Sequence, residues 1–416
     1  MNKRVRMLAQ FLVLAFFAIN TSPGHAYEWP GVYNPLQVIT LNLDMEPGDW
    51  SAVKADSSYT LEVPAQFWAD GETPILVSVR RKSADALGDK VSLKIDINEY
   101  VKQTWSGLKK LSLENGDDVD VVAEGFAWYL NRQAAAAYPS NYTPGLAAWV
   151  RLYVNGEYLG VYLNVEQPDK TFLKNRNIYT KGQTWLYKAS DVNGYELKVG
   201  NPDSPTTTRL CYSPFAVSSD GGGKGKGKKG GGSNTGCAVP EDDAAMAAEL
   251  NSLIDMDSML TQGAVSAFTS GPDALFSKGK NFYYIDFGGE TAKRLYIPWD
   301  LDSVFVGNSA EGSIYGSEKK KRGRIVLSQS PYEEVILNNP EFRARYDQIM
   351  ANLLSIGGPL QVEAQIAFLD DLEMVLTSAL QDDPNNNIDG SVAGRFASLR
   401  DWVVRRAANI DQQLGN

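Results

Sequence analysis

The chain has 416 residues, 43% of them hydrophobic, and a formal net charge of −10. This length can form two or three domains, or one large domain with insertions, and the hydrophobic share is ordinary for a globular protein with a packed core. The negative charge disfavours nucleic acid and anionic membranes as partners.

Residues 1–26 have the pattern of a secretory signal peptide. Three basic residues precede an apolar run at 7–19, and the segment ends in the small residues of Gly24-His25-Ala26. The apolar run is too short for a membrane span. We therefore expect an exported protein, periplasmic, cell-surface or secreted, with no membrane span once the signal is removed.

The only histidine of the chain, His25, lies in this expected signal peptide. A mature chain without histidine excludes Ser-His-Asp and Cys-His nucleophile systems, His-ligated zinc and a His general base. Any catalysis must then depend on carboxylates, Lys, Arg, Tyr and a metal ion.

The first part of the mature chain is predicted to be mainly antiparallel sheet, because short apolar–polar alternations are separated by turn residues. A helix is expected near 117–136, where acidic residues suit the first turn. The clearest hairpin is 149–166, whose two aromatic and β-branched strands are joined through Asn155-Gly156. The other expected strands are 37–47, 59–67, 74–80, 90–96 and 185–189.

A glycine- and lysine-rich insert at 218–236 is predicted to be a flexible linker. It contains a formal GxGxxG match at 225–230, which follows no strand and opens no helix, so it is not read as a nucleotide fingerprint. Cys211 and Cys237 flank the insert, and in an exported chain a disulfide between them is expected. Two cysteines without histidine cannot form a structural zinc site.

From residue 241 onward the apolar residues recur at helical spacing. One further hairpin is expected at 282–297, with turn residues at 286–290, and residues 316–324 are read as a solvated basic loop. The segment 382–390 resembles a calcium-binding loop only superficially and is read as a turn, because Ile388 stands where that loop requires Gly. Helices are expected at 241–269, 331–356, 361–381 and 391–413.

Asp300 and Asp302 follow the second strand of this hairpin directly. In an extended backbone, residues two apart point to the same side, so the two carboxylates would repel each other unless a cation lay between them. Mg²⁺ prefers one or two carboxylates together with phosphate oxygens. The alternative is that both residues only cap a turn.

Several segments resemble, in order, the spore-coat CotH family of atypical protein kinases. The two long ones are LYVNGEYLGVYLNVEQPD at 152–169 and KNFYYIDFGGETAKRLYIPWDLDSVFVG at 280–307. Residues 79–83, VRRKS, are similar to the family's Arg-Gly-Asn-Ser element but lack its Gly-Asn, and 89–96 is similar to its lysine-rich strand. The resemblance covers roughly residues 37–355.

This resemblance implies an α+β, protein-kinase-like bilobal fold with an antiparallel β-rich N-lobe and a mainly helical C-lobe. ATP and Mg²⁺ (or Mn²⁺) would lie between the lobes. The N-lobe would span 27–170, and the C-lobe would span 241–416 and carry the catalytic hairpin 273–307. Residues 171–240 would hold a connecting strand and the insert closed by Cys211–Cys237.

The resemblance also implies catalytic and metal-binding roles. Asp300 would be a metal ligand, with Asp302 as a second, and Asn281 would be the catalytic-loop asparagine that holds the metal. Asp273 would be the base that accepts the proton of the substrate hydroxyl.

Nucleotide-binding roles follow in the same way. Lys94, with Lys90 beside it on the same strand, would pair with the nucleotide phosphates, and Glu124 in the N-lobe helix would hold Lys94. Glu166, together with Gln167 and Pro168, would border the adenine.

The function expected from these residues is an exported ATP- and Mg²⁺-dependent kinase that phosphorylates a hydroxyl side chain of a secreted or envelope protein. The alternatives are a non-catalytic binding protein with a structural divalent cation at Asp300 and Asp302, and a transferase that moves a nucleotidyl group instead.

Overall fold

The computed structural model describes residues 28–117, 119–137, 141–189, 194–201, 204–210, 212, 214–215, 242–289, 293–305, 309–321 and 324–415. The predicted signal peptide, the glycine-rich insert and the predicted disulfide all lie outside these ranges. Within them, no helix is long and apolar enough to cross a membrane.

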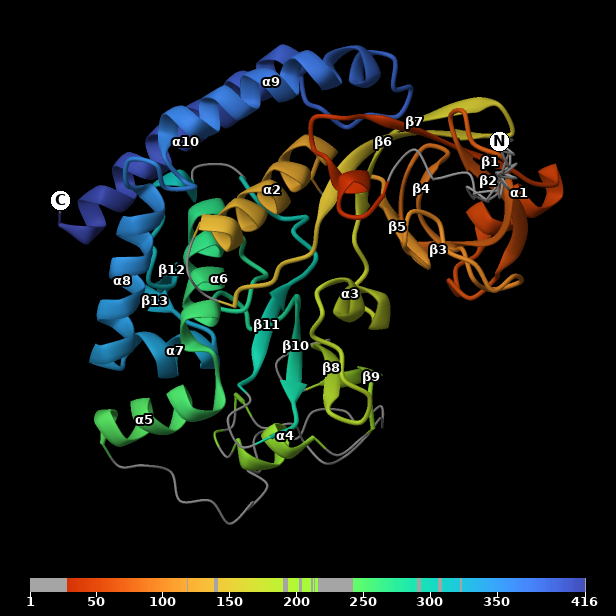
Figure 1. Cartoon of the computed structure of the whole chain (residues 1–416). Helices are drawn as coiled ribbons and strands as arrows, with labels where there is room; N and C mark the ends of the chain where they lie inside the picture. Colours follow the sequence, from red (N-terminus) through yellow and green to blue (C-terminus); the bar gives the residue numbers. More distant parts are fainter. Residues whose placement is uncertain are drawn as a thin grey trace, which may run out of the picture.

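A closed barrel of seven strands forms the first part of the chain (Figure 1). Around the barrel the strand order is β1-β2-β3-β4-β5-β7-β6, and every neighbouring pair is antiparallel except β1 and β6, which run parallel where the barrel closes. The predicted, mainly antiparallel sheet is therefore confirmed, with six antiparallel pairs and one parallel pair at the seam. The strands are β1 (Ile39–Asp44), β2 (Val63–Ala69), β3 (Ile75–Leu87), β4 (Lys90–Asp96), β5 (Lys110–Glu114), β6 (Ala147–Val154) and β7 (Glu157–Val165).

Alternating side chains make this barrel possible. Leu41, Leu93 and Leu152 point into a fully buried apolar interior, while their strand neighbours face outward. The β6–β7 hairpin turns at Asn155 (φ 52°) and Gly156 (φ 80°), the left-handed pair that Asn-Gly favours, so that prediction is confirmed.

A second, four-stranded antiparallel sheet has the order β11-β10-β8-β9 and contains the predicted second hairpin. Its aromatic strands share one large core with most of the helices. A two-stranded ribbon, β12 with β13, occupies the region predicted to be a basic loop. That prediction is wrong, because the aliphatic run 325–327 gives the lysine-rich segment a strand to pair with. The strands are β8 (Thr184–Ala189), β9 (Tyr195–Val199), β10 (Phe282–Phe287), β11 (Leu295–Pro298), β12 (Ser317–Lys321) and β13 (Arg324–Ser328).

Ten α-helices lie within the described residues, most of them in the second half of the chain. The predicted helical region 241–269 is two helices, because the chain extends at Ile254 and Asp255 then caps the second helix. Pro47, expected to end the first strand, instead opens a helix. The helices are α1 (Pro47–Ala55), α2 (Val121–Ala137), α3 (Lys170–Asn175), α4 (Pro205–Arg209), α5 (Asp243–Leu253), α6 (Met256–Thr269), α7 (Pro331–Leu337), α8 (Pro340–Leu354), α9 (Val362–Gln381) and α10 (Val392–Leu414), with short 3₁₀ turns at η1 (Gly31–Tyr33) and η2 (Ser309–Glu311).

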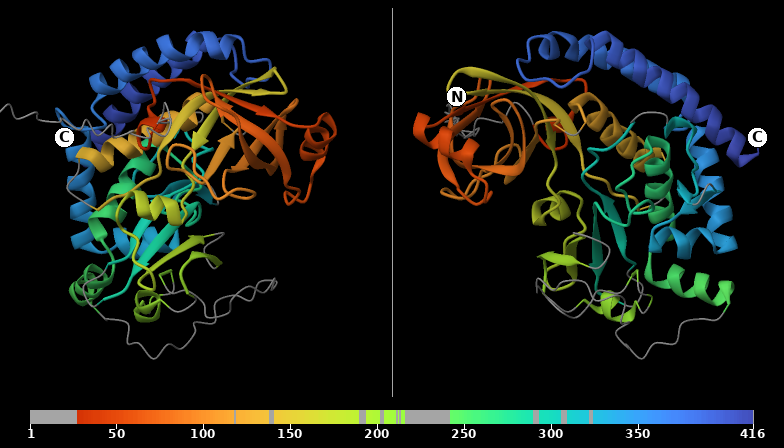
Figure 2. Two further views of the ribbon diagram at one scale, coloured as in Figure 1. Left: turned by 45° about the vertical axis from the view of Figure 1, so that its right-hand side comes forward. Right: turned by 180° about the vertical axis from the view of Figure 1, so that it is seen from behind.

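Two elements connect the barrel to the rest of the protein. Helix α2 packs on β6 and β7 on one side and on α6 on the other. The antiparallel pair α9 and α10 runs from the helical region back to the barrel, so that the turn between them reaches β7 (Figures 1 and 2). At that turn Asp383 accepts a hydrogen bond from the amide of Val161 at 2.8 Å.

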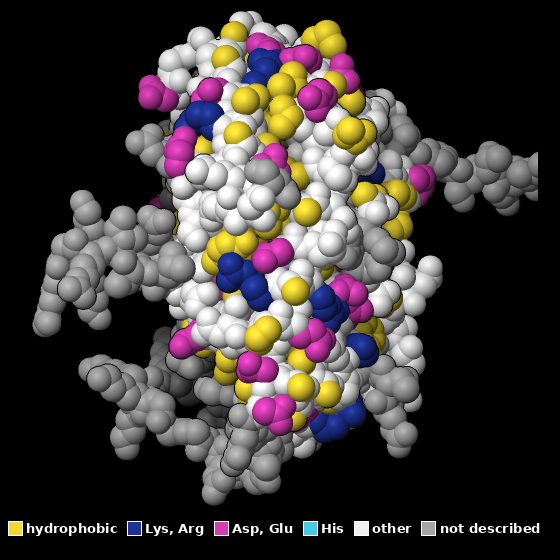
Figure 3. Space-filling view, turned by 90° about the vertical axis from the view of Figure 1, so that its left-hand side faces the viewer, with side chains coloured by type: hydrophobic (Ala, Val, Ile, Leu, Met, Phe, Trp, Pro, Cys, Tyr) yellow, Lys and Arg dark blue, Asp and Glu magenta, His cyan; other side chains and the backbone are white. Residues whose placement is uncertain are grey.

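The face that includes α8 carries Lys and Arg side chains interspersed with Asp and Glu (Figure 3). Several of them are paired, as Arg345 is with Asp257 at 2.6 Å and with Glu341 at 3.6 Å. Mixed charges of this kind keep a surface soluble without creating a strong field of one sign.

Candidate functional site

The site is built on one end of the β10–β11 hairpin, where Asn281 enters β10 and Asp300 leaves β11. The amide of Trp299 donates to the carbonyl of Asn281 at 3.0 Å, and the Asn281 side chain donates to the carbonyl of Asp300 at 3.2 Å. Asn281 and Asp300 both have left-handed backbones, with φ of 55° and 58°. Such conformations are uncommon outside glycine, although Asn and Asp tolerate them best, and they concentrate at functional sites.

This geometry corrects the reasoning that linked the two acids. Residues 299–304 are not a strand, and the left-handed turn at Asp300 removes the extended backbone that would have set Asp300 and Asp302 on one side. Asp300 is exposed and Asp302 is half-buried. The charge of Asp300 acts on Lys82 and Lys188, whereas that of Asp302 acts on Glu124.

Asp273 is brought to the same place as Asp300, since both line one small pocket between the end of α6 and the segment after β11. Asp273 forms ion pairs with Lys278 and with Lys280, the latter at 2.7 Å. Partial burial would raise the pKa of Asp273, but hydrogen bonds from the two lysines outweigh it and hold that pKa below its ordinary value. Asp273 is therefore ionised at neutral pH.

Two lysines from different sheets meet over the indole ring of Trp299. Lys82 on β3 lies 5.2 Å from the ring centroid, and Lys188 on β8 lies 5.6 Å from it. Burial lowers the pKa of Lys188, and the positive charge of Lys82 lowers it further, against the opposing effect of Asp300. The hairpin end thus carries two ammonium groups over one ring, next in the chain to the carboxylate of Asp300.

Lys82 keeps its charge because Glu114 on β5 forms an ion pair with it. Burial would lower the pKa of Lys82, but the charge of Glu114 and its hydrogen bond raise it instead, with smaller contributions from Asp300 and Glu124. The register of β3 against β4 shifts between Arg81 and Ala86, so Lys82 sits at an irregularity of the strand. Such bulges re-aim side chains, and they are frequent next to active sites.

Lys94 on β4 is not paired with Glu124. Its ammonium donates to the Gln167 side chain at 2.9 Å, and Gln167 in turn donates to the Tyr283 hydroxyl at 3.2 Å. Burial, followed by the charges of Arg80 and other nearby cations that include Lys82, lowers the pKa of Lys94 to about 8.

Glu124 on α2 is buried and accepts a hydrogen bond from the Trp128 indole at 3.2 Å. Burial, reinforced by the charge of Glu114, raises the pKa of Glu124 well above its ordinary value. The predicted Lys94–Glu124 pair is thus not formed. The lysine whose charge acts on Glu124 is Lys82 instead.

The side chains of Lys90 and Glu166 are both engaged in buried ion pairs, which corrects the predicted phosphate contact of Lys90, while the place of Glu166 beside the adenine stays a prediction. Lys90 is 1% exposed and forms a 3.0 Å ion pair with Asp383, because the turn after α9 covers the face of β4 that was expected to meet the nucleotide phosphates. Glu166 accepts from Arg176 at 2.7 and 2.8 Å and from the Trp29 indole at 3.0 Å. Both are buried structural ion pairs.

Lys82, Glu114, Lys188 and Trp299 are the site residues that sequence reasoning missed. Lys82 and Trp299 lie within the segments 79–83 and 280–307 that carry the family resemblance. These segments marked the region, but the resemblance assigned no role to either side chain. Glu114 and Lys188 sit on ordinary short strands, where nothing local distinguishes them.

The residues that would hold a divalent cation here are Asp300 and Asp302, through carboxylate oxygens, and Asn281, through its amide oxygen. This set suits Mg²⁺, which takes one or two carboxylates and completes its shell with water and phosphate oxygens. In the described part of the chain, no three or more His, Cys, Asp or Glu side chains are grouped so as to hold a metal ion. Two carboxylates and one amide fit a cation that takes its remaining ligands from water and phosphate oxygens.

The barrel, the second sheet and the helices define an α+β protein, and two lysines meet over Trp299 at the end of its β10–β11 hairpin. The model of the family described as "CotH kinase protein" matches residues 77–410, and the chain belongs to this family. Among individually curated proteins, none matches the chain. The resemblance noted from the two long motifs is thus confirmed, and membership suggests phosphotransferase activity of an atypical kinase.

Proposed function

We propose that the protein is an exported kinase that transfers the γ-phosphoryl group of ATP, with Mg²⁺ or Mn²⁺, to a hydroxyl side chain of a secreted or envelope protein. The main observation in favour is that two lysines from different sheets, Lys82 and Lys188, lie over the ring of Trp299, the residue next to Asp300. Phosphoryl transfer needs this kind of site, because it depends on positioning and charge neutralisation.

In this proposal the barrel with α2 acts as the N-lobe and the second sheet with α5 to α10 acts as the C-lobe of a kinase-like bilobal fold. The cleft between them takes the nucleotide. Lys82 and Lys188 bind phosphate oxygens, and Lys94 with Gln167 lies further along the cleft. Two cations at the phosphates hold them in place and offset the charge that they carry.

Asn281, Asp300 and Asp302 would hold the divalent cation, which when bound neutralises charge on the phosphate oxygens. Asp273 accepts the proton of the acceptor hydroxyl as its oxygen bonds to the γ-phosphorus and the bond to the bridging oxygen of ADP breaks. An ionised carboxylate is sufficient for this role, because it mainly orients the hydroxyl in a loose transition state. The shared pocket of Asp273 and Asp300 supports the assignment.

The first test is label transfer from ATP to protein, using the chain without residues 1–26. With γ-labelled ATP and Mg²⁺ or Mn²⁺ we expect label on the protein itself or on an added acceptor protein, and loss of that signal when EDTA is present. With α-labelled ATP no label should be transferred. Label from the α position would indicate nucleotidyl transfer, and stabilisation by Ca²⁺ without nucleotide binding would favour a non-catalytic protein.

The affinity for Mg²⁺-ATP should fall as the pH rises through about 8. Lys94 loses its charge there, whereas bound phosphates favour the charged form, so binding requires proton uptake above that pH. Titration calorimetry between about pH 7.5 and 9.5 measures this effect. In Lys94→Arg, which stays charged, the fall should disappear, and the matched exchange Lys110→Arg should leave it unchanged. A pH-independent wild-type affinity would contradict the role of Lys94.

A further inference from the structure

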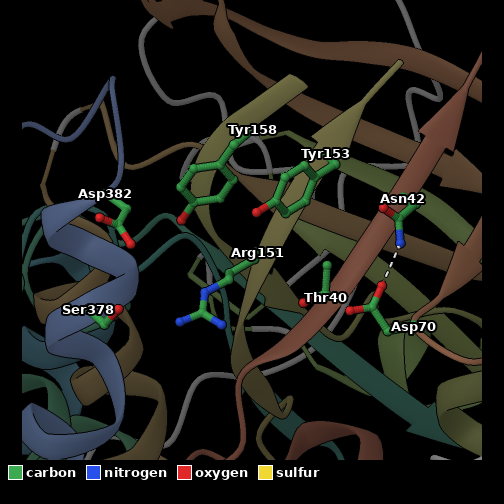
Figure 4. A pocket seen from close by; sticks show the side chains of 8 residues that line it. All are labelled: Thr40, Asn42, Asp70, Arg151, Tyr153, Tyr158, Ser378 and Asp382. Carbon is green, nitrogen blue, oxygen red and sulfur yellow. Dashed lines mark hydrogen bonds between the residues drawn. The ribbon is translucent and has the colours of Figure 1, made fainter. Parts of the chain in front are cut away.

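A second hollow, of about 420 Å³, lies on the outside of the barrel and shares no lining residue with the site at Asp300 (Figure 4). It is large enough for a small ligand. It sits at the seam where β1 and β6 pair in parallel, and the end of α9 forms its opposite wall.

The strand register places its floor on one continuous surface. Thr40 pairs with Arg151 and Asn42 pairs with Tyr153 across the seam, and Tyr153 pairs with Tyr158 in the β6–β7 hairpin. The alternate residues of β1 and β6 fill the barrel interior, so these polar side chains all point outward.

The two walls bring further polar groups toward the same centre. Ser378 and Asp382 stand one helical turn apart at the end of α9, and on the other side Asp70 accepts a hydrogen bond from Asn42 at 3.0 Å. Figure 4 shows the Arg151 guanidinium between these two walls, with the two tyrosine rings above it.

The internal hydrogen bonds of this cluster do not include its central cation, Arg151. Arg151 forms no ion pair or hydrogen bond with any part of the chain that the structure describes, and its neighbour Tyr158 donates to the carbonyl of Ala379 at 2.9 Å. Asp382 is the C-cap of α9, where a carboxylate opposes the helix dipole. Arg151 is thus a half-buried cation that lines the hollow and has no hydrogen-bond or ion-pair partner among the described residues, so its five N–H donors can serve a ligand.

The charged groups and aromatic rings that line the hollow determine which class of ligand it can bind. A phosphate or sulfate at Arg151 would face the carboxylates of Asp70 and Asp382, and a cation would face the guanidinium. An uncharged ligand with many hydroxyls avoids both conflicts, because each hydroxyl donates to a carboxylate and accepts from Arg151 or an amide. The rings of Tyr153 and Tyr158, 5.0 Å apart and tilted by 32°, offer aromatic surface to C–H groups.

We infer that this hollow binds a neutral oligosaccharide, with Arg151 as its central hydrogen-bond donor and the tyrosine pair as its apolar contact. The inference does not depend on phosphotransfer, since the hollow and the proposed active site lie on different elements. It gives the protein a second binding surface, through which it would attach to a polysaccharide.

The test uses the chain without residues 1–26 and a panel of neutral probes: maltohexaose, cellohexaose, chitohexaose, and mannan and galactan fragments. Binding is located on an array and measured by titration calorimetry. We expect at least one probe to bind, and Arg151→Ala and Tyr153→Ala each to weaken it about tenfold or more, as expected for the loss of a charged donor or an aromatic contact. Lys109→Ala, an exposed cation outside the hollow, should keep the wild-type affinity.

Both hollow variants should keep the wild-type melting temperature and the wild-type rate of label transfer. Absence of binding to every probe would overturn the inference, and so would binding that Arg151→Ala leaves unchanged. Polygalacturonate and inorganic phosphate serve as anionic probes. If they alone bind and depend on Arg151, the hollow is an anion site and the carbohydrate assignment is wrong.

Discussion

Asp300→Asn should reduce phosphoryl transfer about a hundredfold to a thousandfold or more, the range seen when a group that stabilises a transition state is removed. Asn keeps the size of Asp and also tolerates a left-handed backbone, so the conformation at φ 58° should survive. The exchange removes the negative charge that would hold the cation and that acts on Lys82 and Lys188. Initial rates of label transfer from γ-labelled ATP with Mg²⁺ measure the loss.

Two matched exchanges separate this role from a general charge effect. Asp302→Asn should lower the rate less, because the charge of Asp302 acts toward Glu124 rather than toward the lysines. Asp389→Asn, at an exposed turn distant in sequence from the site, should have no effect. Wild-type rates in Asp300→Asn, with an unchanged melting temperature, would show that Asp300 is not a metal ligand.

Local signals in the sequence predicted most of the elements. Asn155-Gly156 specified its hairpin because few dipeptides adopt two left-handed residues in a row, and the aromatic run at 282–285 specified the strand that became β10. The same local signals could not predict which strands pair to close the barrel. The parallel pairing of β1 with β6 joins segments about a hundred residues apart, and no local pattern records such a contact.

The site residues that lie on one hairpin were predicted, whereas those that come from several different strands were missed. Asn281 and Asp300 are neighbours through the register of β10 and β11, which the sequence implies. Lys90 and Lys94 were both expected to face the cleft from the same side of one strand. Lys90 and Lys94 do lie on the same side of β4, but Asp383, 293 positions away in the chain, pairs with Lys90 and buries it. The register irregularity of β3 places Lys82 in the role that was expected for Lys94.

Asp383→Ala should lower the free energy of unfolding by about 3–5 kcal/mol, the usual loss when one partner of a buried ion pair is removed. Asp383 is 0% exposed at its side chain and accepts from the Lys90 ammonium at 3.0 Å, the Val161 amide at 2.8 Å and the Asn385 amide at 2.8 Å. Its carboxylate also occupies the space beside Gly160 that a Cβ would need. Without it, the Lys90 ammonium is left buried beside unpaired backbone groups. Guanidinium denaturation followed by tryptophan fluorescence measures the difference.

The double variant Lys90→Met, Asp383→Ala tests the cause of that loss. If the uncompensated ammonium dominates, removing it should recover much of the stability, because apolar side chains often replace a buried ion pair at little cost. Asp382→Ala, the exposed neighbour, should stay within about 0.5 kcal/mol of the wild type. A double variant no more stable than Asp383→Ala would assign the loss to the Val161 and Asn385 amides instead. The Asp383 carboxylate would then hold the α9–α10 turn to the barrel through the hydrogen bond that it accepts from the Val161 amide, and Lys90 would be dispensable.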